Sequence, residues 1–125
     1  MKIKEIYSSF IAWLNGLIED DPIPYEIKSL VFYISSNNEI GFSGTEQTDV
    51  KIVDKFFFHP LEAQYFFCPK LYSNMIERTK EQKLNLLKSL LEKLKLDKNF
   101  AGFNLFYGFM FEKAKKVVNK KDKDK

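Results

Sequence analysis

Cysteine and histidine are almost missing from this sequence, which has one of each, Cys68 and His59, among its 125 residues. An intramolecular disulfide needs two cysteines, so a disulfide framework is excluded. Zinc sites built from several cysteine and histidine ligands are excluded for the same reason. An activated Cys68–His59 pair is not favoured either, because Phe66 and Phe67 give the thiol an apolar neighbourhood in which it stays inert. We therefore expect no metal, no cofactor and no enzymatic activity.

Glycine and long apolar runs are also scarce. The 5 glycines never form G-x-G-x-x-G or G-x-x-x-x-G-K, so a glycine-rich phosphate loop is excluded. The longest nearly apolar run, residues 100–111, has 12 residues, whereas a membrane-spanning helix needs about 20. Glu5, Ser8 and Ser9 interrupt any apolar core of a secretory signal. These absences predict a soluble protein of the cytoplasm.

Charge is low overall but unevenly distributed. The formal net charge is +3. Residues 1–72 hold 6 lysines and 10 acidic residues, whereas the segment from Lys113 onward holds 7 lysines and only two acidic residues, Asp122 and Asp124. We interpret residues 1–119 as a single globular domain and residues 120–125 as a disordered, lysine-rich tail that keeps the protein soluble.

The first half of the chain predicts one helix and three strands. Apolar residues three and four apart over 3–18 predict an amphipathic helix that ends before Pro22. Residues 28–35 and 39–43 read as strands joined by a turn at Ser36-Asn37-Asn38, and apolar side chains on both faces of the first place it inside a sheet. Alternation over 50–58 predicts a third strand, so the three should form an antiparallel meander.

The second half predicts helices. Residues 60–68 fit a short helix, although an irregular aromatic segment fits equally well. A leucine stripe predicts a helix over 74–96, with Asn74 and Glu77 resembling a capping box at its start. A last helix is predicted over 104–119. The order α-β-β-β-α-α-α gives a two-layer α+β domain, with the meander covered by the N-terminal and C-terminal helices.

Aromatic content is the clearest surplus, with 13 Phe, 6 Tyr and 1 Trp in so short a chain. On a helical wheel the apolar residues of 104–119 cover about 200°, more than one packing face requires. The free flank needs a second cover, either the 60–72 segment, another subunit or a membrane surface.

These features favour a small intracellular protein-interaction module. It would associate with another copy of itself, or with another protein, through the aromatic flank of the last helix. The predicted contact residues are Phe103, Tyr107, Phe109, Phe111, Lys113 and Lys116.

Two other functions are compatible with the sequence. The lysine-rich tail could bind nucleic acid weakly and without specificity, but Arg78 is the only arginine available for reading bases. The last helix could instead lie in the surface of an anionic membrane. An apolar pocket for a small ligand between helices and sheet also stays open.

Overall fold

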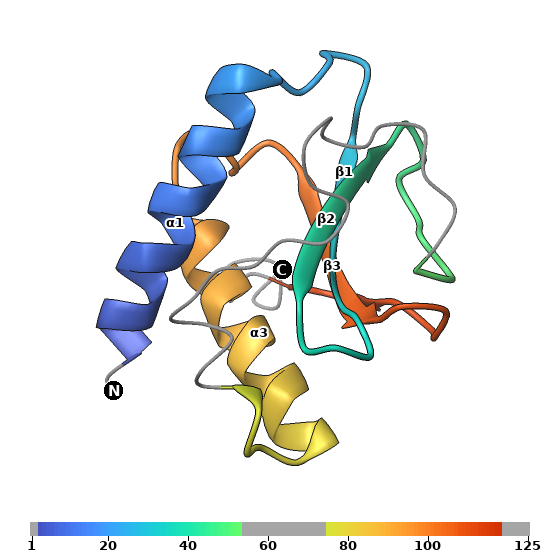
Figure 1. Ribbon diagram of the computed structural model, residues 1–125. Coiled ribbons are helices and arrows are strands. Elements are labelled where there is room, and N and C mark those ends of the chain that lie inside the picture. Colours follow the sequence, from blue (N-terminus) through green and yellow to red (C-terminus); the bar gives the residue numbers. More distant parts are fainter. Residues whose placement is uncertain (1–2, 54–74, 119–125) are drawn as a thin grey trace.

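The computed structural model describes residues 3–53 and 75–118. Within these residues, helices α1 (Ile3–Asp20) and α3 (Lys80–Leu94) lie beside a sheet (Figure 1), which has four strands. The strands are β1 (Ser29–Ile34), β2 (Ile40–Thr45), β3 (Asn104–Phe109) and the short β4 (Lys115–Lys116). The α+β class is therefore confirmed. The predicted segments 54–58 and 60–68 and the tail 120–125 lie outside the described residues.

Helix α1 confirms the first prediction closely. Its inner face buries Ile6, Phe10 and Leu14 in the core. The helix ends at Asp20, and the two prolines at 22 and 24 prevent it from continuing. Within the described residues, neither helix is both long and apolar enough to cross a membrane.

The β1–β2 hairpin is also as predicted. The strands pair antiparallel from Ser29↔Thr45 to Ile34↔Ile40. Asn38 takes a left-handed conformation with φ of 61°, which Asn tolerates better than most residues. The Ser35 hydroxyl oxygen accepts hydrogen bonds from the backbone N–H groups of Asn37 and Glu39. Hydrogen bonds between neighbouring residues thus form this turn.

Residues 104–119 do not form the predicted helix. Residues 104–109 are strand β3, which pairs in parallel with β1 from Ser29↔Asn104 to Ile34↔Phe109. An apolar run without regular polar positions fits a buried strand as well as a helix, and aromatic residues favour strands. The apolar residues of this segment cover a wide arc of a helical wheel because the segment is in fact a strand, and a strand buried on both faces has apolar residues at nearly every position.

The three-stranded meander is also corrected. The strand order is β2-β1-β3-β4, so the second neighbour of β1 is a parallel strand from the end of the chain. Of the predicted third strand, the described residues 50–53 make only an isolated bridge, Ile52↔Lys113. The interior position predicted for β1 is confirmed.

Helix α3 confirms the leucine stripe but starts later than predicted. Its capping box is Thr79 with Gln82, where the Thr79 hydroxyl accepts from the Gln82 N–H and the Gln82 side chain accepts from the Thr79 N–H. Threonine is one of the two residues usual at the start of a capping box, and the Asn74 that the sequence suggested lies outside the described residues. At this end of the helix, the Lys80 Nζ atom forms an ion pair with Glu112 and lies 4.8 Å from the centroid of the Phe109 ring.

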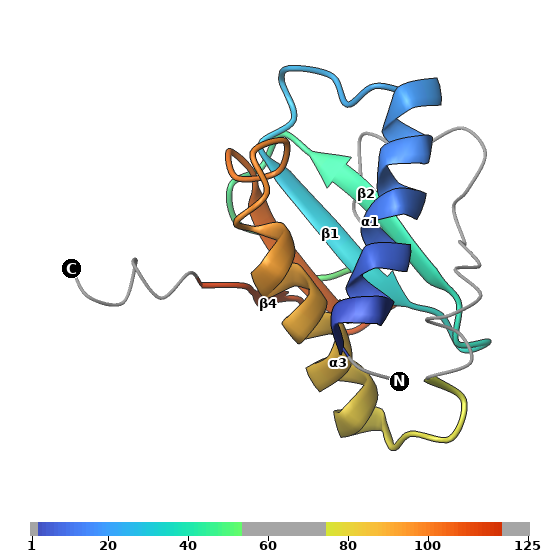
Figure 2. The ribbon, with the colours of Figure 1, turned by 90° about the vertical axis from the view of Figure 1, so that its left-hand side faces the viewer.

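Both helices pack on one face of the sheet, as Figures 1 and 2 show. The main core joins the inner faces of α1 and α3 to alternate strand residues such as Phe32, Phe42 and Leu105. A smaller cluster on the opposite face contains Val31, Tyr33, Val50, Val53, Phe106 and Ala114. The second face is therefore covered by residues 50–53 and by the segment that joins β3 to β4.

Candidate binding surfaces

The structure divides the six predicted contact residues between the two faces of the sheet. Tyr107 is only 6% exposed, and Phe103 and Phe109 pack half-buried against the main core. These three rings therefore contribute to the main core, and Tyr107 is almost fully enclosed in it. Burial, and secondarily the negative charge of Glu92, raise the pKa of Tyr107.

Phe111, Lys113 and Lys116 do come together on the surface. They line a hollow of about 680 Å³ with residues from the 49–52 segment, which the sequence places about sixty positions earlier. We define the Phe111 patch as Lys51, Ile52, Phe111, Lys113 and Lys116. All five are exposed, with Phe111 at 66% and Ile52 at 46%. Lys51 and Ile52 were not predicted as contact residues.

Backbone hydrogen bonds hold this patch in place. The Phe111 N–H donates to the Val53 carbonyl oxygen, and the Val53 N–H donates to that of Glu112, both at 3.1 Å. The Ala114 N–H donates to the carbonyl oxygen of Lys51 at 3.1 Å. The two segments therefore form one framework, which fixes Ile52 and Phe111 relative to the surrounding lysines.

Phe111 occupies a left-handed backbone conformation, with φ of 67°. This region costs a residue with a Cβ roughly 1–2 kcal/mol. We expect Phe111→Gly to raise the free energy of unfolding by about 0.5–1 kcal/mol, because the relieved strain exceeds the added entropy of the unfolded chain. Urea denaturation of the two proteins measures the difference.

Asn38→Gly is the matched control for this prediction. Asn38 has a similar φ of 61° but already tolerates it, and its side-chain oxygen accepts a hydrogen bond from Lys83. Glycine at position 38 should therefore bring no gain. A destabilised Phe111→Gly protein would show that contacts of the ring outweigh the backbone strain.

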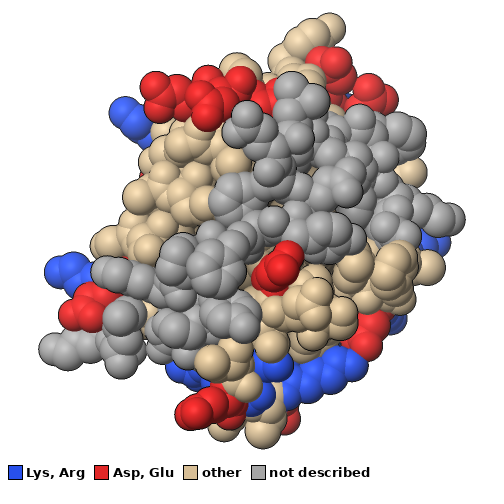
Figure 3. Space-filling model, viewed as in Figure 1, with Lys and Arg blue, Asp and Glu red and all other residues tan. Residues whose placement is uncertain are grey.

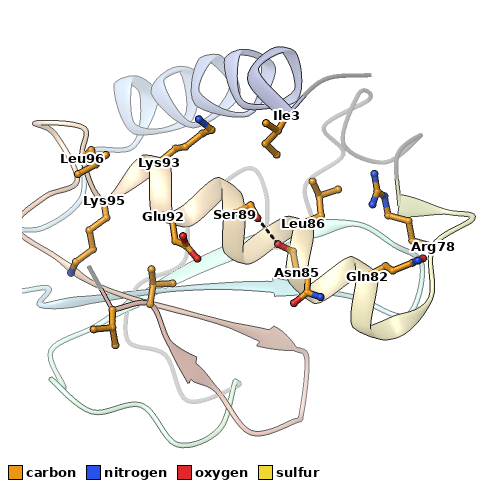
Figure 4. Close-up of a pocket in the computed structure, with 12 residues that line it drawn as sticks. Ile3, Arg78, Gln82, Asn85, Leu86, Ser89, Glu92, Lys93, Lys95 and Leu96 are labelled. Carbon is orange, nitrogen blue, oxygen red and sulfur yellow. Dashed lines mark hydrogen bonds between the residues drawn. The ribbon is translucent and has the colours of Figure 1, made fainter. Parts of the chain in front are cut away.

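A second surface runs along the outer side of α3, as Figure 4 shows. We call it the α3 groove, and its volume is about 790 Å³. Gln82, Asn85 and Ser89 follow one another along α3 from its first turn, on the helix face that spacings of three and four create. The rest of its lining comprises Ile3, Arg78, Leu86, Glu92, Lys93, Lys95, Leu96, Val117 and Val118.

The α3 groove combines apolar contacts with excess positive charge. Three cationic side chains line it against one acidic side chain, Glu92. Leu96 is 72% exposed at the carboxyl end of the groove, and Val118, which also lines it, is 42% exposed. The apolar wall of the groove, Ile3, Val117 and Val118, comes from parts of the chain distant from α3.

Acidic side chains concentrate elsewhere. Figure 3 shows them gathered at the end of the molecule where α1 stops, which includes Glu19 and Asp20. Within residues 3–53 and 75–118, no three of His, Cys, Asp and Glu lie close enough to hold a metal ion. His59 and Cys68, the pair considered for catalysis, lie outside the described residues.

Comparison with protein-family models, with curated proteins and with solved structures gave no significant match. A function for this chain must therefore be inferred from the chemistry of its two surfaces, the α3 groove and the Phe111 patch.

Proposed function

We propose that this chain is a protein-interaction module that binds an acidic, amphipathic segment of a partner protein along the α3 groove. The observation that supports it is the groove itself, which is elongated, partly apolar and net positive. This proposal keeps the interaction function expected from the sequence but places the contact on another surface, because Phe103, Tyr107 and Phe109 pack against the main core.

The length of the groove favours a peptide segment over a small molecule. Helix α3 has 15 residues and is about 22 Å long. The lining residues extend from Arg78 before the helix to Leu96 after it. Amphipathic helices bind such grooves through apolar anchors three or four residues apart, and Leu96, which is 72% exposed, offers an apolar contact for such an anchor.

The charge of the groove favours a partner different from this chain. Two copies joined by their α3 grooves would bring like charges together, since each groove carries three cations and one anion. Docking the acidic end of one copy into the groove of the next would be a head-to-tail contact, which builds rings or open filaments and not a two-fold dimer. A separate acidic partner avoids both problems.

The test uses two synthetic helix-forming peptides of about 14 residues, a length that spans α3. Both peptides have the same leucine stripe. One has glutamate at every polar position and the other has lysine there. We expect the acidic peptide to bind and the basic peptide not to bind, as measured by fluorescence anisotropy. Lys93→Glu and Leu96→Ser should each weaken the acidic peptide about tenfold, because each removes one of the two contributions to binding. Amide chemical shifts should change along α3.

Lys88→Glu is the matched control, since Lys88 is an exposed lysine of the same helix that does not line the groove. It should change the affinity less than twofold. Equal binding of both peptides, or shift changes confined to other surfaces, would contradict the proposal. If the free chain forms a dimer and the Leu96→Ser variant does not, the occupant of the groove is a second copy of this chain and not an acidic partner.

A further inference from the structure

The exposure of Phe111 is not explained by folding. A large aromatic ring lies 66% exposed at a position where the backbone has a φ of 67°. Glycine or asparagine would take this conformation at lower cost. Strained residues concentrate at functional sites, so the combination of strain and exposure indicates that the ring itself is used.

The surroundings of Phe111 are basic. Lys51, Lys113 and Lys116 are exposed around Phe111 and Ile52, and among the described residues the structure gives none of these lysines an ion pair. Asp49 is the acidic residue that lines the same hollow, and Glu112, which follows Phe111, is paired with Lys80. The patch therefore has a positive charge around two exposed apolar side chains.

All the cations of the patch are lysines. Lysine is a compact point charge, whereas arginine is favoured where a phosphate or base edge is bound with fixed two-point geometry. Lysines around an apolar anchor suit a diffuse anionic surface, where each cation contributes by proximity and the ring enters the boundary between headgroups and acyl chains. An anionic bilayer provides both kinds of contact at once.

We propose that the Phe111 patch binds the surface of membranes that contain anionic phospholipid, with Phe111 and Ile52 entering the interface and Lys51, Lys113 and Lys116 lying against the headgroups. The segment that joins β3 to β4 then acts as the anchor, in place of the helix expected from the sequence. This surface is separate from the α3 groove, so either proposal can fail without the other.

Co-sedimentation with sucrose-loaded vesicles tests the proposal. We expect the full chain to bind vesicles of phosphatidylcholine with about 30% phosphatidylserine, an anionic surface, and to leave pure phosphatidylcholine vesicles unbound. Phe111→Gly should reduce binding about tenfold. Because this variant is expected to be at least as stable as the parent protein, its loss of binding cannot be attributed to unfolding. Lys113→Glu with Lys116→Glu should also reduce binding about tenfold or more.

Tyr25→Gly is the matched control, since Tyr25 is another aromatic residue and is 98% exposed. It should leave binding unchanged. A Phe111→Trp variant gives a second readout, because its emission should shift to the blue when phosphatidylserine vesicles are added.

Three results would overturn the proposal. The first is equal vesicle binding by Phe111→Gly and the parent chain, which would assign binding to lysines elsewhere, including those of residues 119–125. The second is an unshifted Phe111→Trp emission in the presence of bound vesicles. The third is tighter binding of the chain to single-stranded oligonucleotide than to vesicles, together with loss of this preference in Phe111→Gly. That result would make the patch a nucleic-acid site.

Discussion

Phe32→Ala is expected to lower the free energy of unfolding by about 3–5 kcal/mol, the largest effect of any single substitution considered for this protein. Phe32 is fully buried in the middle of β1. Its ring centroid lies 5.3 Å from that of Phe42 on β2 and 5.8 Å from that of Phe10 on α1. Truncation to alanine would leave a cavity between the sheet and α1 that neighbours cannot easily fill.

Urea denaturation followed by circular dichroism measures this loss. A domain of this size typically has a total stability of about 5–15 kcal/mol, so the variant should unfold at much lower urea or be partly unfolded in buffer. Tyr25→Ala is the control, because that side chain is 98% exposed and its removal should change stability by less than about 0.5 kcal/mol. A loss below about 1 kcal/mol for Phe32→Ala would contradict the packing of α1 against β1 and β2.

Gly108→Val tests whether residues 104–109 are a strand or a helix. A Cβ at Gly108 would lie 3.2 Å from both the Lys113 carbonyl oxygen and the Val53 Cγ2 atom. The larger valine side chain cannot fit there without moving the 110–114 segment or Val53. We expect the free energy of unfolding to fall by about 1–3 kcal/mol, as in other overpacked sites.

The same position would behave differently in the helix that the sequence suggested. Inside an exposed helix, glycine costs roughly 1 kcal/mol relative to alanine, so Gly108→Ala would be stabilising. Gly102→Val is the control, because nothing lies within 4 Å of a Cβ at Gly102. Stabilisation of the protein by both Gly108→Ala and Gly108→Val would show that the strand assignment is wrong.

The sequence by itself determined the elements whose signals are local. Helix α1 results from apolar spacing and two prolines, and the β1–β2 hairpin results from alternation around an Asn-containing turn. The leucine stripe of α3 is equally plain, although the capping residue was Thr79 and not Asn74. In each case, residues within a few positions of one another hold the chemical information.

The sequence could not decide the state of residues 104–109. Leu105, Phe106 and Tyr107 are all buried, so the segment has no polar phase that would distinguish a period of two from a period of about 3.6. Its strand state depends on pairing with β1, which lies 75 positions earlier in the chain. Parallel pairing has no local turn signal, because its connection must cross from one end of the sheet to the other.

The same reason limits what the sequence revealed about the surfaces. Phe111, Lys113 and Lys116 were expected at a contact surface on the flank of the predicted last helix, and although that helix is absent they do line one hollow. Lys51 and Ile52 join them only through backbone hydrogen bonds between segments far apart in the chain. Tyr107 and Phe109 were assigned to the same surface, but strand alternation directs them to the opposite face of the sheet. Composition determined that aromatic surface would be abundant, and tertiary pairing decided which rings it buries and which it exposes.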